Sequence, residues 1–240
     1  MKEENAMPSR PMHKPKISAS IICANWMQLE KDLKALEEHG VEYIHYDVMD
    51  GVFVEDYGLG VAMINEIRRH TRLQPDYHLM VEEPHRVLRN LTPEKEAILS
   101  IHCEASRNLH RDLVTIRKLG FRVGLVLNPA TTLETIEYVM GEADVVTVMT
   151  VNPGSKGQKL IPPMLKKIEA LRRLRQERSL TFQISADGNM DAQNIGMMVA
   201  AGVDIIVGGS SGLFVPGRPL GESLDQMRRL IEEGLALKRE

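Results

Sequence analysis

The sequence predicts a single (β/α)₈ barrel, which is an α/β fold. Eight short apolar segments alternate with longer amphipathic ones along the 240 residues, and strands that alternate with helices pair in parallel through right-handed crossovers. Eight such units is the number that closes a barrel, and about 250 residues is a typical length for one. A doubly wound open sheet is the rival fold, but the first predicted strand leads into CANWMQ rather than into a glycine-rich turn.

Each predicted strand is a short apolar run that a longer amphipathic segment follows. In chain order, the predicted strands cover residues 17–22, 42–49, 75–81, 97–104, 122–128, 144–151, 181–187 and 204–209. No linker divides this series. We therefore expect one domain over residues 17–240, preceded by a flexible, proline-containing tail over residues 1–16.

The predicted helices fill the intervals between the strands. The first covers residues 26–40, where apolar residues recur at spacings of three and four and Gly40 ends the pattern. The least regular pattern, over residues 84–92, predicts a short helix after the third strand. The remaining predicted helices cover residues 60–71, 108–120, 131–143, 162–178, 191–202 and 221–240.

The composition excludes several classes of protein. A formal net charge of −3 gives no electrostatic argument for binding nucleic acid or an anionic membrane. The two cysteines, Cys23 and Cys103, have no metal-binding spacing and form no disulfide framework, which fits a reducing compartment. Because no run approaches about 18 apolar residues and the N-terminus lacks the apolar core of a signal peptide, we expect a cytoplasmic protein.

Four side chains of types that bind metals lie at the predicted C-terminal ends of the strands. His45 and Asp47 are two residues apart in one strand, so they project from the same face. His78 lies near the end of the third strand, and Asp187 ends the seventh. Barrel enzymes place their chemistry at this face. Two imidazoles and two carboxylates there could bind a divalent metal and leave positions open for substrate oxygens.

Each of these residue types also has a structural explanation. A single histidine in a strand is more often hydrogen-bonded within the core than bound to a metal, and we interpret His102, Glu104 and Asp76 in that way. Asp50, which glycine follows, is interpreted as a turn residue. The set of four differs from these residues because the predicted fold brings its members independently to one end of the barrel.

Three glycine-containing loops follow the last three strands and are typical of a phosphate site. They read NPGSKGQ over residues 152–158, DGN over residues 187–189 and GGSSG over residues 208–212. Barrels frequently bind phosphate with the loops after strands seven and eight. Glycine lets backbone N–H groups approach the anion closely. Lys156 could add a positive charge.

Six longer motifs follow one another in the chain: ISASIICANW, IHYDVMDGVFV, DYHLMVEEP, VGLVLNPATTLE, VMTVNPGSKGQ and SADGN. They resemble the motifs of the ribulose-phosphate 3-epimerase family, in the family's order, and cover residues 17–215. The resemblance implies a metal-dependent (β/α)₈ enzyme that inverts the carbon next to the carbonyl group of a phosphorylated ketose.

The resemblance also implies roles for individual residues. His45, Asp47, His78 and Asp187 match the family's metal ligands, and Asp47 and Asp187 also match its two acid/base carboxylates. Together with the glycine loops, the match predicts the following substrate-binding residues: Ser20, Met49, His78, Met80, Met149, Gly154, Ser155, Lys156, Gly157, Gly188, Asn189, Gly209, Ser210 and Ser211. Family members commonly assemble, so we expect a homo-oligomer.

The implied chemistry accounts for this set of residues. A proton next to a ketone is weakly acidic, so a cation that contacts both oxygens of the enediolate lowers the barrier to its removal. One aspartate takes the proton from one face and the other returns a proton to the opposite face, which inverts C3 without an organic cofactor. Two histidines and two carboxylates suit zinc, iron(II), manganese or cobalt.

Three stretches depart from the family's usual pattern. Residues 52–60 read VFVEDYGLG in place of H-F-V-P-N-x-T-F-G, Ser155 and Lys156 replace phenylalanine and glycine, and Asn189 replaces glycine. These changes concern the substrate pocket, so we expect the same reaction on a shifted substrate. VMTVNPG and SGLF (211–214) resemble the D-allulose-6-phosphate 3-epimerase branch. Both D-ribulose 5-phosphate/D-xylulose 5-phosphate and D-allulose 6-phosphate/D-fructose 6-phosphate therefore stay open.

Two alternative functions use the same barrel. A lyase such as a hexulose-phosphate synthase would lack this arrangement of a His-x-Asp pair with Asp187 on the other face. A non-catalytic phosphosugar-binding protein would have lost one of the two carboxylates, and this chain has both.

Overall fold

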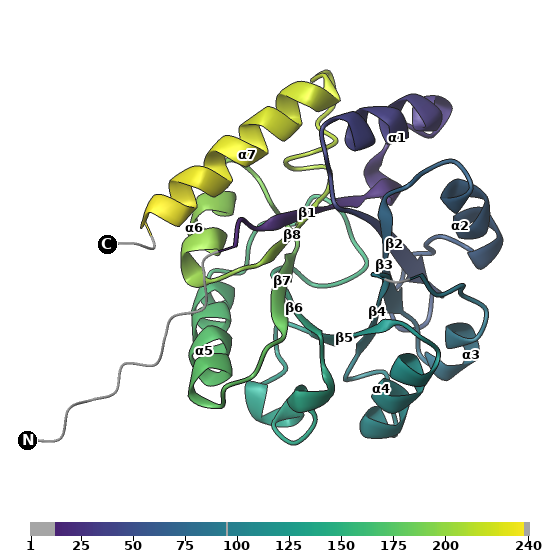
Figure 1. The fold of residues 1–240 in the computed structure, drawn as a ribbon, viewed down its shortest axis with the longest axis vertical. Helices are drawn as coiled ribbons and strands as arrows, with labels where there is room; N and C mark the ends of the chain where they lie inside the picture. The colour runs from purple at the N-terminus through teal and green to yellow at the C-terminus, as the bar shows by residue number, and fades with distance from the viewer. Residues whose placement is uncertain (1–12, 95, 238–240) are drawn as a thin grey trace, which may run out of the picture.

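The eight predicted strands form one closed parallel barrel in chain order, with β8 pairing back to β1. The computed structural model describes residues 13–94 and 96–237. Figure 1 shows the strands around the centre of the molecule and the helices outside them. The strands are β1 Lys16–Ser20, β2 Tyr43–Met49, β3 Gln74–Met80, β4 Ile98–His102, β5 Arg122–Leu127, β6 Val145–Met149, β7 Gln183–Asp187 and β8 Ile205–Gly208. This confirms the predicted fold class.

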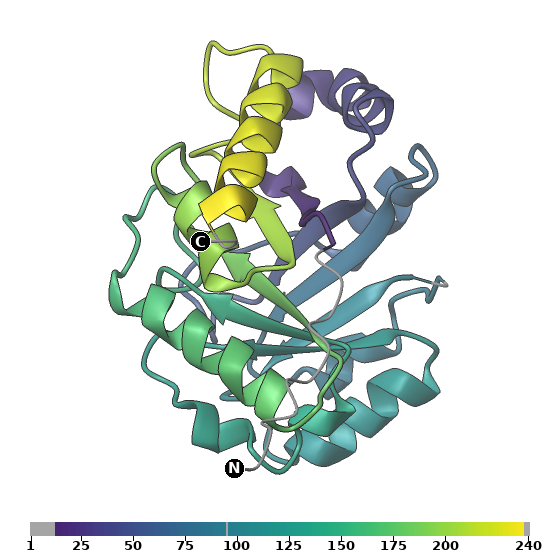
Figure 2. The same ribbon diagram turned by 60° about the vertical axis from the view of Figure 1, so that its left-hand side comes forward.

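Helices cover the outside of the barrel. They are α1 Leu29–Glu38, α2 Val61–Arg68, α3 His85–Leu88, α4 Leu109–Lys118, α5 Pro163–Glu177, α6 Asn194–Ala201 and α7 Leu220–Leu237. Figure 2 shows α5 to α7, in green to yellow, on the outer side of the later strands. Among the described helices, none is long and apolar enough to cross a membrane.

The predicted helix over residues 131–143 is wrong. Two 3₁₀ segments, Leu133–Ile136 and Met140–Glu142, replace it. The apolar residues Leu133, Ile136 and Val139 lie three apart and pack against the core, and this spacing matches the three residues per turn of a 3₁₀-helix. The irregular segment after β3 contains only one helical turn, α3.

An apolar layer fills the end of the barrel at which the strands begin, the N-terminal end. Its members come from alternate strands, as is usual in this fold, and they are Tyr43, Ile98, Val145 and Ile205. Toward the strands' C-terminal ends the buried strand residues include many polar ones: Ser18, Ser20, His45, Asp47, Asp76, His78, Ser100, His102, Thr147 and Ser185. Because buried polar groups are costly unless they are paired, this concentration indicates a functional site.

The ends of the chain and the outer surface add little to this picture. Residues 1–12 of the predicted tail lie outside the described residues, and Lys14 Nζ donates to Glu232 Oε1 of α7 at 2.8 Å.

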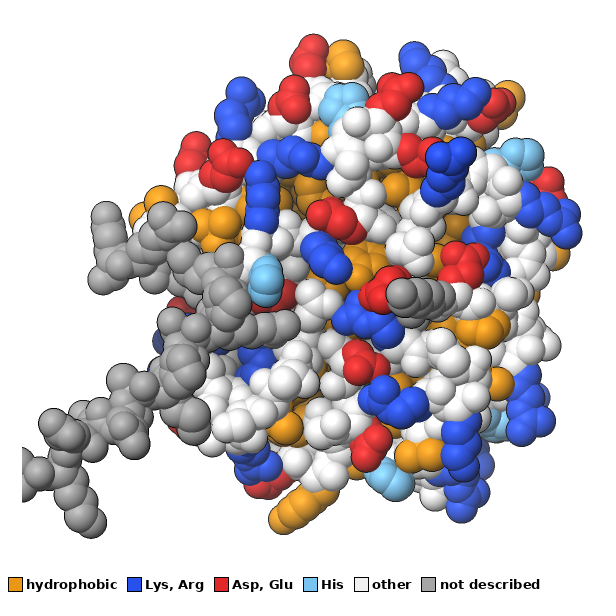
Figure 3. Space-filling view, in the orientation of Figure 1, with side chains coloured by type: hydrophobic (Ala, Val, Ile, Leu, Met, Phe, Trp, Pro, Cys, Tyr) orange, Lys and Arg blue, Asp and Glu red, His pale blue; other side chains and the backbone are white. Residues whose placement is uncertain are grey.

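Side chains of both charges are interspersed over the face in Figure 3. That distribution agrees with the small net charge and gives this face no single-sign patch for a polyanion.

Candidate active site

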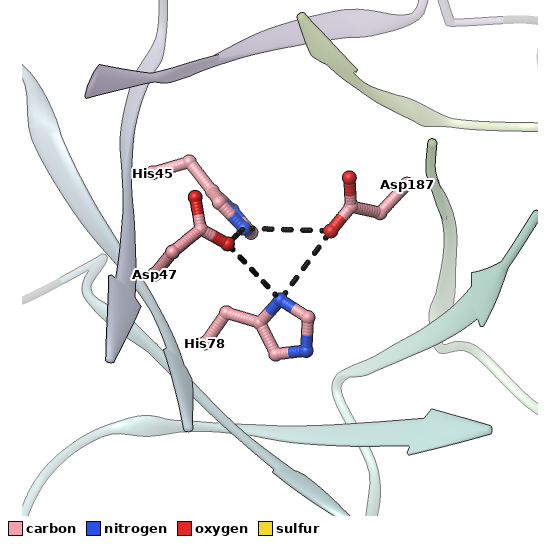
Figure 4. A group of neighbouring side chains, drawn as sticks. All are labelled: His45, Asp47, His78 and Asp187. Atoms are coloured by element: carbon pink, nitrogen blue, oxygen red, sulfur yellow. Dashed lines mark ion pairs between the residues drawn. The ribbon is translucent and has the colours of Figure 1, made fainter. Parts of the chain in front are cut away.

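The structure brings the four predicted metal-binding residues together at the C-terminal end of the barrel. On β2, His45 and Asp47 share a face, and Asp47 lies opposite His78 in the β2–β3 register. Asp187 reaches the same point from the end of β7. One possible ligand atom from each residue lies within 4.8 Å of the other three, and Figure 4 shows the four side chains pointing toward one another. The predicted convergence is confirmed.

The donor atoms fit a shared divalent cation. His45 Nε2 lies 3.3 Å from Asp47 Oδ1 and 3.7 Å from Asp187 Oδ2. His78 Nδ1 lies 3.6 Å and 3.3 Å from the same two oxygens. Such separations suit donors that are each roughly 2.0–2.2 Å from one ion. Both nitrogens are buried and have no hydrogen-bond partner among the described residues, and a cation would supply that partner.

The electrostatics of this cluster favour positive charge. Burial opposes the charged form of His45, but the Asp76 and Asp47 carboxylates raise its pKa well above the usual value. Burial also opposes charge on His78, and contacts with Asp187 and Asp47 raise its pKa. For Asp47, burial favours the neutral acid, yet the charge of His45 and the close contacts with His45 and His78 lower its pKa. A metal that binds here would displace protons from the histidines.

Asp76 lies directly behind His45. Its Oδ2 atom is 2.7 Å from His45 Nδ1 and accepts a hydrogen bond from Ser18 Oγ at 2.7 Å. A carboxylate in this position holds the ring with Nε2 free to face a metal. From the sequence alone, Asp76 was predicted to be structural. Its position two residues before His78, on the same face of β3, was the available signal.

His102 and Glu104 lie behind His78 in a similar way. His78 Nε2 is 2.8 Å from His102 Nε2, and His102 Nδ1 is 3.5 Å from Glu104 Oε2. Burial lowers the pKa of His102 to about 4. Burial opposes ionisation of Glu104, but contacts with His102, Thr131 and the Asn128 backbone lower its pKa to about 2. From the sequence alone, both residues were predicted to be structural; the available signal was that His102 ends β4 and Glu104 follows it by two residues.

A pocket opens above the cluster of four. Except for His78, which is 1% exposed, all the predicted substrate-binding residues line this pocket. Asp47 and Asp187 are also in its wall. The lining also includes residues outside the predicted substrate-binding set, of which Asn152, Pro153 and Gln158 belong to the predicted phosphate loop and the others are Ile22, Cys23, Val151, Met190 and Val207. Three of them, Pro153, Gln158 and Met190, are immediate neighbours of predicted residues, and position in the chain was the available signal for these.

The loop between β6 and α5 forms one side of the pocket. Gly154 has φ +94°, and a Cβ atom there would lie 2.6 Å from Val54 Cβ, so only glycine fits. Gln158 Nε2 donates to Asn152 O at 2.6 Å and ties the loop to itself. Lys156 Nζ donates to Ile22 O at 2.9 Å, which places its ammonium group at the pocket beside the end of β1.

The loop after β2, where the chain departs from the usual motif, packs against the β6–α5 loop through Val54, which lies beside Gly154, and its residues 50–60 are not among those that line the pocket. Asp50 Oδ1 accepts from Val52 N and Phe53 N at 2.9 Å, as expected for a turn residue. Its Oδ2 atom accepts from Glu82 N of the next loop at 2.8 Å. These bonds position Phe53 against His102, with ring centroids 4.7 Å apart.

Comparison with known proteins agrees with this site. The family described as the ribulose-phosphate 3 epimerase family matches residues 16–214. A ribulose-phosphate 3-epimerase from Synechocystis sp. is 40% identical over 202 residues, which cover 83% of this chain and 88% of the relative. The Bacillus subtilis enzyme of that name is 38% identical over 197 residues, which cover 82% of this chain and 91% of the relative.

Solved structures share the fold at much lower sequence identity. The crystal structure of 3-hexulose-6-phosphate synthase from Salmonella typhimurium has a TM-score of 0.65 and 12% identity. The match covers 91% of this chain and 99% of that one. At this identity the similarity shows the barrel alone.

Proposed function

This chain belongs to the ribulose-phosphate 3-epimerase family, and on that premise we propose that it is a metal-dependent isomerase that inverts C3 of a phosphorylated ketose. The observation that carries the proposal is the pair of carboxylates, Asp47 and Asp187, which come from β2 and β7 and meet beside two histidines at the pocket floor. A lyase on the same barrel is less well supported, because its likeness to this chain is limited to the fold.

In this proposal His45, Asp47, His78 and Asp187 hold one divalent cation, whose charge would stabilise the negative charge that develops on the substrate oxygens. Asp47 and Asp187 transfer protons at C3 from opposite faces, so removal by one and return by the other inverts the carbon. Ser20 Oγ donates to Asp47 Oδ2 at 2.7 Å and fixes the direction of that carboxylate.

The other pocket residues bind and enclose the substrate. Met49, Met80 and Met149 line the pocket next to the carboxylates; their sulfur atoms exclude water without offering a competing acid. The glycine loops around Gly154, Gly188 and Gly209 present backbone groups to the substrate phosphate, and Ser155, Lys156, Gly157, Asn189, Ser210 and Ser211 complete this proposed grip.

The substrate pair that the comparisons favour is D-ribulose 5-phosphate and D-xylulose 5-phosphate, because the relatives described above carry the name ribulose-phosphate 3-epimerase. A second candidate is the pair D-allulose 6-phosphate and D-fructose 6-phosphate. It is favoured by Ser155, Lys156 and Asn189, which differ from the usual family pattern and line the pocket.

A panel of pentulose and hexulose phosphates incubated with the metal-loaded protein in D₂O tests the proposal. We expect deuterium at C3 and formation of the C3 epimer, fastest with the true substrate. Cleavage to smaller carbonyl compounds would support a lyase instead. Binding of a ketose phosphate without deuterium uptake at C3 would indicate a non-catalytic phosphosugar-binding protein.

Three further expectations stay predictions. They are the division into a tail over residues 1–16 and a domain over residues 17–240, assembly into a homo-oligomer, and a cytoplasmic location. Light scattering during gel filtration would measure the oligomeric state. Limited proteolysis would show whether cleavage is confined to the predicted tail.

A further inference from the structure

We propose that Glu104 and His102 are positioning residues that decide which nitrogen of His78 carries its proton, and thereby prepare His78 Nδ1 to bind a metal. The inference rests on the proposed metal site and deepens it. It concerns where one proton lies between two rings, and no change of net charge is involved.

The two nitrogens of His78 face different surroundings. Nδ1 faces the metal site, 3.3 Å from Asp187 Oδ2 and 3.6 Å from Asp47 Oδ1. Nε2 faces away from that site and lies 2.8 Å from His102 Nε2. The two ring planes differ by only 20°, so the rings meet edge to edge through these nitrogens. At this distance one N–H must donate to the other nitrogen's lone pair.

Two arrangements satisfy this N–H···N contact, since a neutral imidazole carries one proton. In the first, His78 Nε2–H donates to His102, so His78 Nδ1 keeps a lone pair toward the metal site and His102 Nδ1 carries a proton. In the second, His102 Nε2–H donates to His78, so His78 Nδ1 carries a proton and His102 Nδ1 has a lone pair. Only the first arrangement lets His78 bind a metal.

Glu104 favours the first arrangement. Its Oε2 atom lies 3.5 Å from His102 Nδ1, too far for a strong hydrogen bond but close enough for its charge to attract an N–H and to repel a lone pair. The carboxylate is held in place because its Oε1 atom accepts from Asn128 N at 2.9 Å and from Thr131 Oγ1. His102 is fully buried beneath Phe53, so little water screens this interaction.

His45 needs no such relay, because the Asp76 carboxylate contacts its Nδ1 atom directly at 2.7 Å. The two metal-facing histidines therefore differ in the group that contacts their other ring nitrogen. For His45 this group is the carboxylate of Asp76, and for His78 it is the imidazole of His102, with the Glu104 carboxylate behind it. Changes at Glu104 should act on His78 alone.

The substitution Glu104→Gln tests this reasoning with little change in shape. The amide oxygen can keep the bonds to Asn128 and Thr131, while the NH₂ group takes the place of Oε2. A donor then faces His102 Nδ1 and favours the second arrangement. We expect zinc affinity to fall by about tenfold to a hundredfold, the usual effect of losing an outer partner of a metal ligand. Competition with a chromophoric chelator measures this affinity.

Glu37→Gln is a matched control. Glu37 Oε1 also accepts from a threonine hydroxyl, Thr71, and from a backbone N–H, that of Arg72, each at 2.6 Å. Glu37 lies on α1 and is not among the residues that line the site. The Glu37→Gln variant therefore shows the effect of the same chemical change on the fold alone. The zinc affinity of this variant should equal that of the wild type.

The nitrogen-15 chemical shifts of the histidine rings give a second readout that does not depend on activity. In the zinc-loaded wild type, the protons should lie on His78 Nε2 and His102 Nδ1. In metal-free Glu104→Gln protein, at a pH high enough for both rings to be neutral, they should lie on His78 Nδ1 and His102 Nε2. If the Glu104→Gln variant does not fold, the spectrum of the zinc-loaded wild type is sufficient as a test. A proton on His102 Nε2 in that protein overturns the inference.

Unchanged zinc affinity in Glu104→Gln, or an equal loss in Glu37→Gln, also overturns it. These failures differ from failure of the proposed function. A wild type that binds zinc and exchanges C3 protons, together with an unaffected Glu104→Gln variant, removes only the role of Glu104. A wild type that binds no zinc removes both proposals.

Discussion

Replacing Asp187 by asparagine is expected to slow epimerisation by about 10²–10⁴ while proton exchange at C3 of one epimer continues. Asp47 remains on its own side of the pocket, where Ser20 holds it at 2.7 Å. It can still remove a proton from one face and return a solvent proton to that same face. The product of such a cycle is the starting epimer labelled with deuterium, because no group is left to protonate the other face.

The expected magnitude follows from the loss of one positioned acid/base group. Such a group contributes about 10²–10⁴ in rate, which equals about 2.7–5.4 kcal/mol at 1.36 kcal/mol per tenfold change. The Asp187 side chain is 17% exposed and that of Asp47 is 9% exposed. Since water can reach Asp187 more easily, we expect Asp187→Asn to lie nearer the lower limit and Asp47→Asn nearer the upper one. The double variant should be little worse than Asp47→Asn, because the two groups act as a unit.

The assay incubates each purified epimer separately with metal-loaded protein in D₂O and follows deuterium at C3 and the epimer ratio by NMR. Asp187→Asn should label one epimer, and Asp47→Asn should label the other. Labelling of both epimers by either variant, or continued interconversion within tenfold of the wild-type rate, would refute the assignment of the two carboxylates to opposite faces. Zinc binding measured in parallel separates loss of the acid/base group from loss of the metal.

Three other perturbations have defined outcomes. A chelator should abolish epimerisation, and addition of a divalent metal should restore it, whereas activity that persists in metal-free protein would contradict a metal role. Gly58→Ala should lower the free energy of unfolding by about 1–3 kcal/mol in urea titrations, because its Cβ would lie 2.3 Å from the Asp47 carbonyl oxygen. Gly60→Ala, with nothing within 4 Å of its Cβ, is the control and should change stability little. Lys156→Met should raise KM about tenfold to a hundredfold through loss of a charged hydrogen bond to phosphate, while Lys159→Met on the same loop should leave KM unchanged.

The local patterns in the chain were sufficient for most of the architecture. Short apolar runs predicted all eight strands, because the strands are buried. The segments between these runs have apolar residues at helical spacing and so mark where each strand begins and ends. The helix over residues 131–143 failed because Leu133, Ile136 and Val139 fit a period of three as well as a helical one, and contact with the core decided between them.

The sequence by itself determined the fold class and the face on which His45 and Asp47 lie, since two-residue alternation is a property of a single strand. The tertiary structure decided which groups stand behind the histidines. Asp76 contacts His45 because β3 pairs with β2 in one register, and His102 contacts His78 because β4 follows β3 around the closed barrel. Register and closure depend on pairing between strands that are distant in the chain. For that physical reason, a buried aspartate and a buried histidine looked like ordinary core residues until their neighbours were in place.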